Sequence, residues 1–213
     1  MSAASKRWFS VILMAVMAVS LVAATAGLQG CGSDQSKQDF VDSVLSIIEE
    51  NQSNTEIVQE GQVAFQAYYQ SGFTDLESAA GAAESFVKSN EKDALSLQKL
   101  RELDKPDEAA QEIVDTLASG IETMDEGNSA YAEELGKAPE QSVEERSQIF
   151  VIAVDVMGVY LEGIDDIIAS CAQLLDYAQT NGLEGEQEIE DWYNKFQAER
   201  DAMLQSMEAM SGE

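Results

Sequence analysis

The chain has 213 residues, with 40 acidic side chains, 12 basic side chains and no histidine, and its formal net charge is −28. Without histidine it has no Ser-His-Asp triad, no Cys-His pair and no imidazole ligand for zinc or iron. Two cysteines are too few for a disulfide framework or a Cys₄ zinc site. The acidic excess argues against nucleic-acid binding, which depends on basic side chains that neutralise phosphates.

An apolar segment occupies the N-terminus. Lys6 and Arg7 are the only charged residues before Asp34, and residues 9–23 are almost purely apolar. A short basic start followed by an apolar run is typical of a secretory signal. The sequence therefore predicts a signal peptide over residues 1–30.

The apolar run ends in Leu28-Gln29-Gly30-Cys31. This tetrapeptide resembles the lipobox of bacterial lipoproteins, with Leu28, Gly30 and Cys31 in the expected places and Gln29 as a departure from the pattern. The resemblance implies that Cys31 becomes the mature N-terminus and carries acyl chains such as palmitate. Two or three chains anchor a protein stably in a membrane. Residues 31–36 are then the acylated cysteine and a polar tether.

An uncleaved membrane helix is the alternative interpretation of this segment, because about 20 apolar residues span a bilayer. The cysteine at the edge of the apolar run favours the lipoprotein. Both interpretations place the rest of the chain outside the cytoplasm, held at a cell membrane or an outer membrane.

Residues 37–213 show apolar side chains spaced by three and four, which predicts amphipathic helices, and no alternating run that predicts a strand. The apolar stripes begin at Val44, Leu76, Ala110, Val143 and Ile189. In the second stripe the expected members are Leu76, Ala80, Ala83, Val87, Asn90, Ala94 and Leu97, supported by Phe86, Leu100 and Leu103.

Helix start and stop signals separate the five stripes. Capping-box patterns begin at Thr74 and Ser142, Pro106 suits a first helical turn, and Gly182 suits a left-handed stop. Short connections make successive helices antiparallel. We therefore expect an all-α fold, an acidic up-and-down bundle of four to five long antiparallel helices over residues 37–213.

The fourth segment is apolar on two faces between residues 149 and 178, which predicts a central helix. Small residues predict close helix approaches at Gly158 and Gly163, and along residues 79–83. Cys171 lies within the apolar stripe and is expected to pack as a small core residue.

Four polar residues interrupt the apolar patterns. Asn51, Asn90 and Asn128 each fall within a stripe, where an asparagine either fixes the helix register or lines a small polar cavity. Asp155 lies between two apolar runs, where it either contacts a cation or ligand, or faces water on the outer edge of the helix. A buried position requires a partner for its charge.

The pattern as a whole predicts a membrane-anchored, extracytoplasmic lipoprotein that is not an enzyme and that binds or spaces another component of the cell envelope. In outline it resembles helical-bundle lipoproteins of unknown function. The alternative is a small-ligand or cation-binding lipoprotein with a site near Asp155. We expect no cofactor and no tightly bound transition metal, and a partner that is an envelope protein, not a nucleic acid.

Overall fold

The computed structural model describes residues 32–211. The signal segment and the lipobox residues Leu28, Gln29, Gly30 and Cys31 lie outside the described residues. The helices are α2 (Gly32–Gln70), α3 (Leu76–Glu102), α4 (Glu108–Lys137), the short η1 (Ala138–Glu140) and α5 (Val143–Arg146), α6 (Ile149–Asn181) and α7 (Glu186–Ser211). The described part of the chain contains no strand, and the predicted all-α bundle is confirmed.

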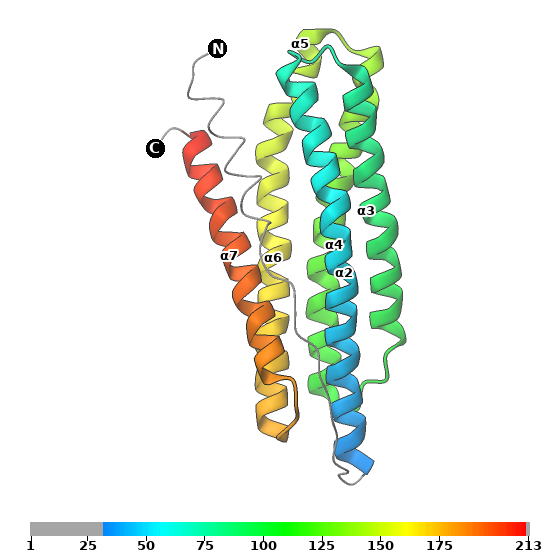
Figure 1. Ribbon diagram of the computed structural model, residues 1–213, viewed down its shortest axis with the longest axis vertical. Coiled ribbons are helices and arrows are strands. Elements are labelled where there is room, and N and C mark those ends of the chain that lie inside the picture. Colours follow the sequence, from blue (N-terminus) through cyan, green and yellow to red (C-terminus); the bar gives the residue numbers. More distant parts are fainter. Residues whose placement is uncertain (1–31, 212–213) are drawn as a thin grey trace.

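Each long helix packs against the next one along the chain. Helices α2, α3, α4 and α6 run alternately up and down, and α7 lies along α6 at the edge of the bundle (Figure 1). Short connections enforce this antiparallel order. Residues 32–36, which the sequence analysis described as a polar tether, are helical and form the start of α2.

Side-chain caps fix where the helices begin. Asp75 caps α3 by accepting from the Ser78 backbone N–H at 3.1 Å, so the cap is one residue later than the expected Thr74. Asp107 caps α4 in the same way. The capping box predicted at Ser142 is present, with Glu145 as its reciprocal partner.

The fourth predicted segment is divided in two. The capped helix α5 ends at Arg146, and α6 begins at Ile149 after a single turn. The predicted left-handed stop of α6 is confirmed at Gly182, whose φ is 65°. Glycine adopts this conformation without the steric cost that a Cβ brings.

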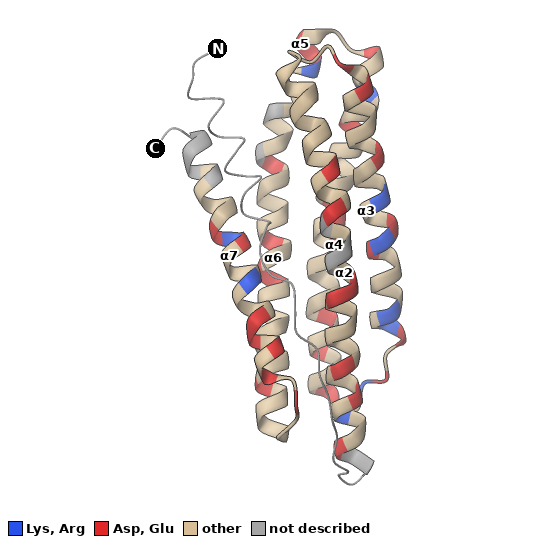
Figure 2. Cartoon of the chain, in the orientation of Figure 1, with Lys and Arg blue, Asp and Glu red and all other residues tan. Residues whose placement is uncertain are grey.

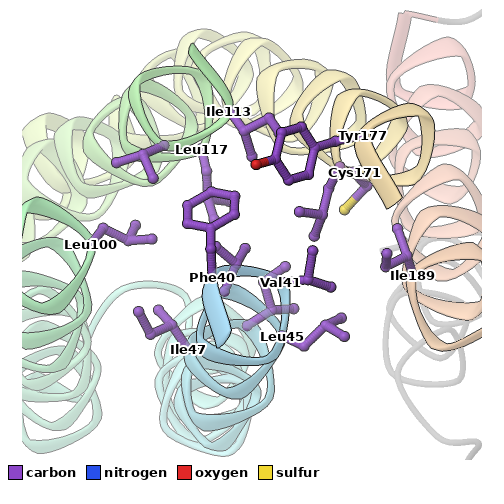
Figure 3. Close-up of a cluster of buried hydrophobic side chains, with 14 of the residues drawn as sticks. Phe40, Val41, Leu45, Ile47, Leu100, Ile113, Leu117, Cys171, Tyr177 and Ile189 are labelled. Carbon is purple, nitrogen blue, oxygen red and sulfur yellow. The ribbon is translucent and has the colours of Figure 1, made fainter. Parts of the chain in front are cut away.

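The apolar core has two clusters at different heights of the bundle. The larger one gathers side chains from α2, α3, α4, α6 and α7, among them Val41, Leu100 and Leu174 (Figure 3). The smaller one, near the α2–α3 connection, includes Tyr68, Phe86, Leu135 and Ile149. The larger cluster contains the buried Cys171, as expected.

The face of α3 that is buried is rotated by about one residue relative to the face that the sequence predicts. Ala80, Val87 and Ala94 are exposed, and the buried positions are Ala79, Ala82, Phe86, Ser89, Asp93, Ser96, Leu97 and Leu100. Phe86, Leu97 and Leu100 are buried as expected. The rest of the predicted stripe is wrong, because the buried face continues through the polar residues Ser89, Asp93 and Ser96. Their burial is possible because they hydrogen-bond to one another and to neighbouring helices.

Two glycines bring α4 and α6 into close contact. A Cβ placed on Gly120 would lie 2.7 Å from the carbonyl oxygen of Gly163, and a Cβ on Gly163 would lie 2.8 Å from the carbonyl oxygen of Gly120. The predicted close approach at Gly163 is therefore confirmed. The one predicted at Gly158 is wrong, because a Cβ there has no atom within 4 Å.

Acidic side chains cover the outside of every long helix, with few basic ones among them (Figure 2). Within the described residues one stretch, Val143–Asn181, is long and apolar enough to cross a membrane by length and composition alone. Part of this stretch is buried inside the bundle, where α6 packs between α4 and α7 and contributes Ile167, Cys171 and Leu174 to the core.

Candidate functional site

A layer of polar side chains separates the two apolar clusters. It draws on all four helices of the up-and-down bundle: Asn51 and Asn54 from α2, Ser89, Asn90 and Asp93 from α3, Asp125, Asn128 and Ser129 from α4, and Tyr160 from α6. We call this group the polar layer. It contains the three asparagines that the sequence analysis selected, and it does not contain Asp155.

Asp93 is the centre of the hydrogen bonds in the polar layer. Its side chain is nearly inaccessible, at 5% exposed. Asn51 donates from Nδ2 to Oδ1 of Asp93 at 2.7 Å, and Asn54 donates from Nδ2 to Oδ2 at 2.8 Å. Two helices thus meet through a carboxylate and two amides, an arrangement that reduces the cost of burying the charge.

Asp125 lies beside Asp93, and the two carboxyl groups are close enough to share a proton. A hydrogen bond between two carboxyls requires that one of them carries a proton. Burial, and after it the charge of Asp93, raises the pKa of Asp125 to about 8. Burial also raises the pKa of Asp93, against the opposing effect of its hydrogen bonds. The pair therefore holds one proton at neutral pH.

The other half of the layer is a chain of neutral hydrogen bonds. The Tyr160 hydroxyl donates to Oδ1 of Asn128, and Nδ2 of Asn128 donates to Oγ of Ser89 at 3.2 Å. Ser89 also accepts from Nδ2 of Asn54 at 2.9 Å. Burial raises the pKa of Tyr160, so the hydroxyl stays protonated as a donor. This chain links α6 through α4 and α3 to α2.

Asn90 connects α3 and α4 at the edge of the layer. Its Nδ2 donates to the backbone oxygen of Asp125 at 3.2 Å and to Oγ of Ser129 at 2.7 Å. These contacts agree with the interpretation in which the asparagines fix the helix register. They bind specific partners on neighbouring helices, which fixes the register, and they surround a buried polar group.

Asp155 is exposed on α6. The structure therefore supports the interpretation in which it faces water, and it gives no support for a ligand site around it. Sequence reasoning missed Asp93, Asp125, Asn54 and Ser89. For Asp93 and Ser89 the available signal was the regular spacing of residues 79, 82, 86, 89, 93, 96 and 100 on α3.

The polar layer consists of amides, carboxyls and hydroxyls, and its Ser89 hydroxyl, which donates to Oδ2 of Asp93 at 3.5 Å, is buried. Its two carboxyls have a raised affinity for a proton. In the part of the chain that the structure describes, no three or more Cys, Asp or Glu side chains gather in a way that could hold a metal ion. The only thiol among residues 32–211 is Cys171, whose pKa burial raises to about 12.

No protein-family model, no curated protein and no solved structure matches this chain. The functional argument therefore stands on the lipobox-like sequence and on the geometry described above.

Proposed function

We propose that this protein is a lipid-anchored extracytoplasmic lipoprotein whose helical bundle is a non-enzymatic binding or spacing module of the cell envelope. The observation that carries the proposal is Leu28-Gln29-Gly30-Cys31 at the end of the N-terminal apolar run. Acylation of Cys31 replaces the apolar segment as the membrane anchor, and two or more chains hold the protein stably.

The position of α2 supports a spacing role. This helix begins at Gly32, the residue after Cys31 in the sequence, and continues without interruption for 39 residues. At a rise of about 1.5 Å per residue its length is about 58 Å. One end of the bundle is therefore next to the anchor, and the α2–α3 connection, η1 and α5 lie at the opposite end (Figure 1).

A network at the anchor end fixes α2 to the rest of the bundle. Lys37 donates to Oδ1 of Asn181 at 2.7 Å and lies 3.3 Å from Oδ2 of Asp107, which also accepts from the Tyr177 hydroxyl at 3.1 Å. Helices α2, α4 and α6 are joined at one point close to the start of α2. A rigid connection here transmits the position of the anchor to the whole bundle.

The acidic surface (Figure 2) indicates the chemistry of a partner. With a formal net charge of −28 the protein repels nucleic acids, other polyanions and anionic lipid headgroups at low salt. The partner is therefore a cationic or neutral envelope component. The absence of histidine, together with the burial of Asp93 inside the bundle, supports a module that binds without catalysing.

The anchor is tested by labelling cells with a palmitate analogue and comparing two cysteine variants. We expect the wild-type protein and Cys171→Ala to incorporate the label and to have the size of the processed form. Cys31→Ala lacks the acylation site and should remain an unlabelled precursor. An unlabelled wild-type protein of precursor size would replace the proposal with an uncleaved membrane helix.

The partner is tested by crosslinking in intact cells followed by purification of the protein. We expect enrichment of one envelope component by the wild-type protein, and a loss of that enrichment with Cys31→Ala, because the unprocessed chain is not displayed correctly. Equal recovery with both forms would show that anchoring does not contribute to binding.

A further inference from the structure

We propose that Asn181 is a site of spontaneous deamidation that the folded bundle keeps closed through Lys37, and that the reaction loosens the junction between α2 and the end of α6. Asn181 is followed by Gly182, and the chain contains no other Asn-Gly pair. The inference concerns the chemistry of this pair and does not rest on the lipid anchor.

The reaction joins an asparagine side chain to the backbone nitrogen of the next residue. The nitrogen of Gly182 loses its proton and attacks Cγ of Asn181. The new N–Cγ bond replaces the Cγ–Nδ2 bond, and ammonia leaves with the proton. Water then opens the cyclic imide at either of its carbonyls and gives aspartate or isoaspartate. In sum, one amide and one water become one carboxylic acid and one ammonia.

Sequence and exposure both select Asn181 among the asparagines. Glycine has no Cβ to shield its nitrogen, and its backbone is the most permissive. Asn181 is half-buried and Gly182 is exposed, so solvent water reaches the pair. The buried Asn54 and Asn128 are instead followed by a threonine and a serine, whose β-carbons hinder the attack.

Hydrogen bonds hold the pair in an arrangement that does not react. Lys37 donates from Nζ to Oδ1 of Asn181 at 2.7 Å, and Nδ2 of Asn181 donates to the backbone oxygen of Tyr177 at 2.8 Å. The N–H of Gly182 donates to two carbonyl oxygens in the last turn of α6. Before the imide closes, the side chain has to turn away from Tyr177 and the Gly182 N–H has to leave this cap.

Lys37 is the part of this arrangement that comes from another helix. It lies on α2, and its Nζ is also 3.3 Å from Oδ2 of Asp107 at the start of α4. A charged donor binds the amide oxygen of Asn181 more strongly than a neutral donor does. The reactive side-chain conformations are therefore reached when α2 and the end of α6 separate, through local opening of the bundle.

The products do not restore the original contacts. Aspartate at position 181 retains an acceptor for Lys37 but has no N–H for the backbone oxygen of Tyr177. In isoaspartate the backbone runs through the former side chain, which moves Gly182 out of the left-handed position that ends α6. Each reaction thus weakens the connection of α6 to α2 irreversibly.

The test follows Asn181 by peptide mass spectrometry while the purified protein in detergent stands in a mildly alkaline buffer. The wild-type protein is compared in its folded form and unfolded in concentrated urea. Lys37→Met keeps the aliphatic part of the side chain and removes the donor. Lys195→Met is the matched control, because it removes the same charge on α7, where Lys195 lies over the Trp192 ring. Hydrogen exchange is then measured on the deamidated and the unmodified fractions.

We expect Asn181 to deamidate at least about tenfold more slowly in the folded than in the unfolded wild-type protein, because the reaction waits for local opening. Lys37→Met should react severalfold faster than the folded wild-type protein, and Lys195→Met at the wild-type rate. In the deamidated fraction, amides in the last turn of α6 should exchange faster than in the unmodified fraction.

Three results would overturn the proposal. Equal rates in the folded and the unfolded wild-type protein would show that the fold does not protect Asn181. A slower reaction in Lys37→Met would show that the ammonium group promotes the attack by polarising the amide. Unchanged exchange after deamidation would show that the junction is not loosened. If Lys37→Met fails to fold, the comparison of folded with unfolded wild-type protein and the exchange measurement still decide.

Discussion

At the scale of single residues, Asp125 makes the stability of the bundle depend on pH. Its pKa is raised from the ordinary value of 3.8 to about 8, by burial first and then by Asp93. The folded state therefore binds a proton that the unfolded chain releases near pH 4. The contribution of this proton to the stability of the folded state is complete below about pH 4 and is lost as the pH rises toward about 8.

This sign predicts the behaviour of Asp125→Asn in the presence of a chelator. The wild-type protein should lose stability between pH 5 and pH 9 relative to the variant, which has no carboxyl at this position to ionise. The expected difference is at least about 1 kcal/mol, the free energy of a tenfold change in proton affinity. Urea unfolding at the two pH values measures it. Asp155→Asn changes an exposed side chain, so its free energy of unfolding should depend on pH as that of the wild-type protein does. The same dependence on pH in all three proteins would contradict the prediction.

The polar layer also shows what the sequence could reveal about the site. Asn51, Asn90 and Asn128 were found because each breaks an otherwise apolar stripe. Asp93 and Asp125 were not found, because 40 acidic residues make any one of them inconspicuous. The α3 pattern added to this failure. Alanines and serines on several of its faces gave little contrast, so most of the predicted face was displaced by one residue and did not include Asp93.

At the scale of secondary-structure elements, the contact of α4 with α6 depends on Gly120. A Cβ at this position would meet the Gly163 carbonyl oxygen at 2.7 Å and Cγ1 of Ile167 at 2.8 Å. We predict that Gly120→Ala lowers the free energy of unfolding by about 1–3 kcal/mol, the typical cost of overpacking. Urea denaturation provides the measurement.

Gly158→Ala is the matched control on α6. A Cβ there meets no atom within 4 Å, and alanine is the better helix former, so this variant should gain about 0.5–1 kcal/mol. Equal effects of the two substitutions would show that helix propensity, and not close packing, decides both.

Two leucines of α6 test which face of this helix packs against its neighbours. Leu174 is buried at 1% exposed within the larger cluster, whereas Leu161, one of the apolar positions of the predicted central helix, is only half-buried. We predict that Leu174→Ala costs about 2–5 kcal/mol and that Leu161→Ala costs less. Thermal or urea unfolding of the two variants checks the order, and the reverse order would mean that α6 turns a different face to the bundle.

At the scale of the whole molecule, the helices and their order could be predicted from the sequence. Apolar spacing, caps and breakers agreed, and agreement between such independent signals specifies a fold. The place of α7 could not be predicted, because its stripe is short of large buried residues beyond Ile189. The subdivision at residues 147–148 was also missed, since a single turn between α5 and α6 leaves the apolar pattern unbroken.

The acidic exterior and the proposed lipid anchor both support the spacing role. In the proposed function, a bundle that repels anionic headgroups and polyanions, and that is held by acyl chains at one end, stands away from the membrane. The central claim is therefore the covalent state of Cys31, because the spacing role requires that the chain be attached directly before α2.

Mass spectrometry of the N-terminal peptide of the protein purified from membranes tests that claim most directly. The account predicts a mature chain that begins at Cys31, with a diacylglyceryl group on the sulfur and no residue from the segment 1–30. A peptide that contains Met1 or any part of the apolar run joined to an unmodified Cys31 would contradict it.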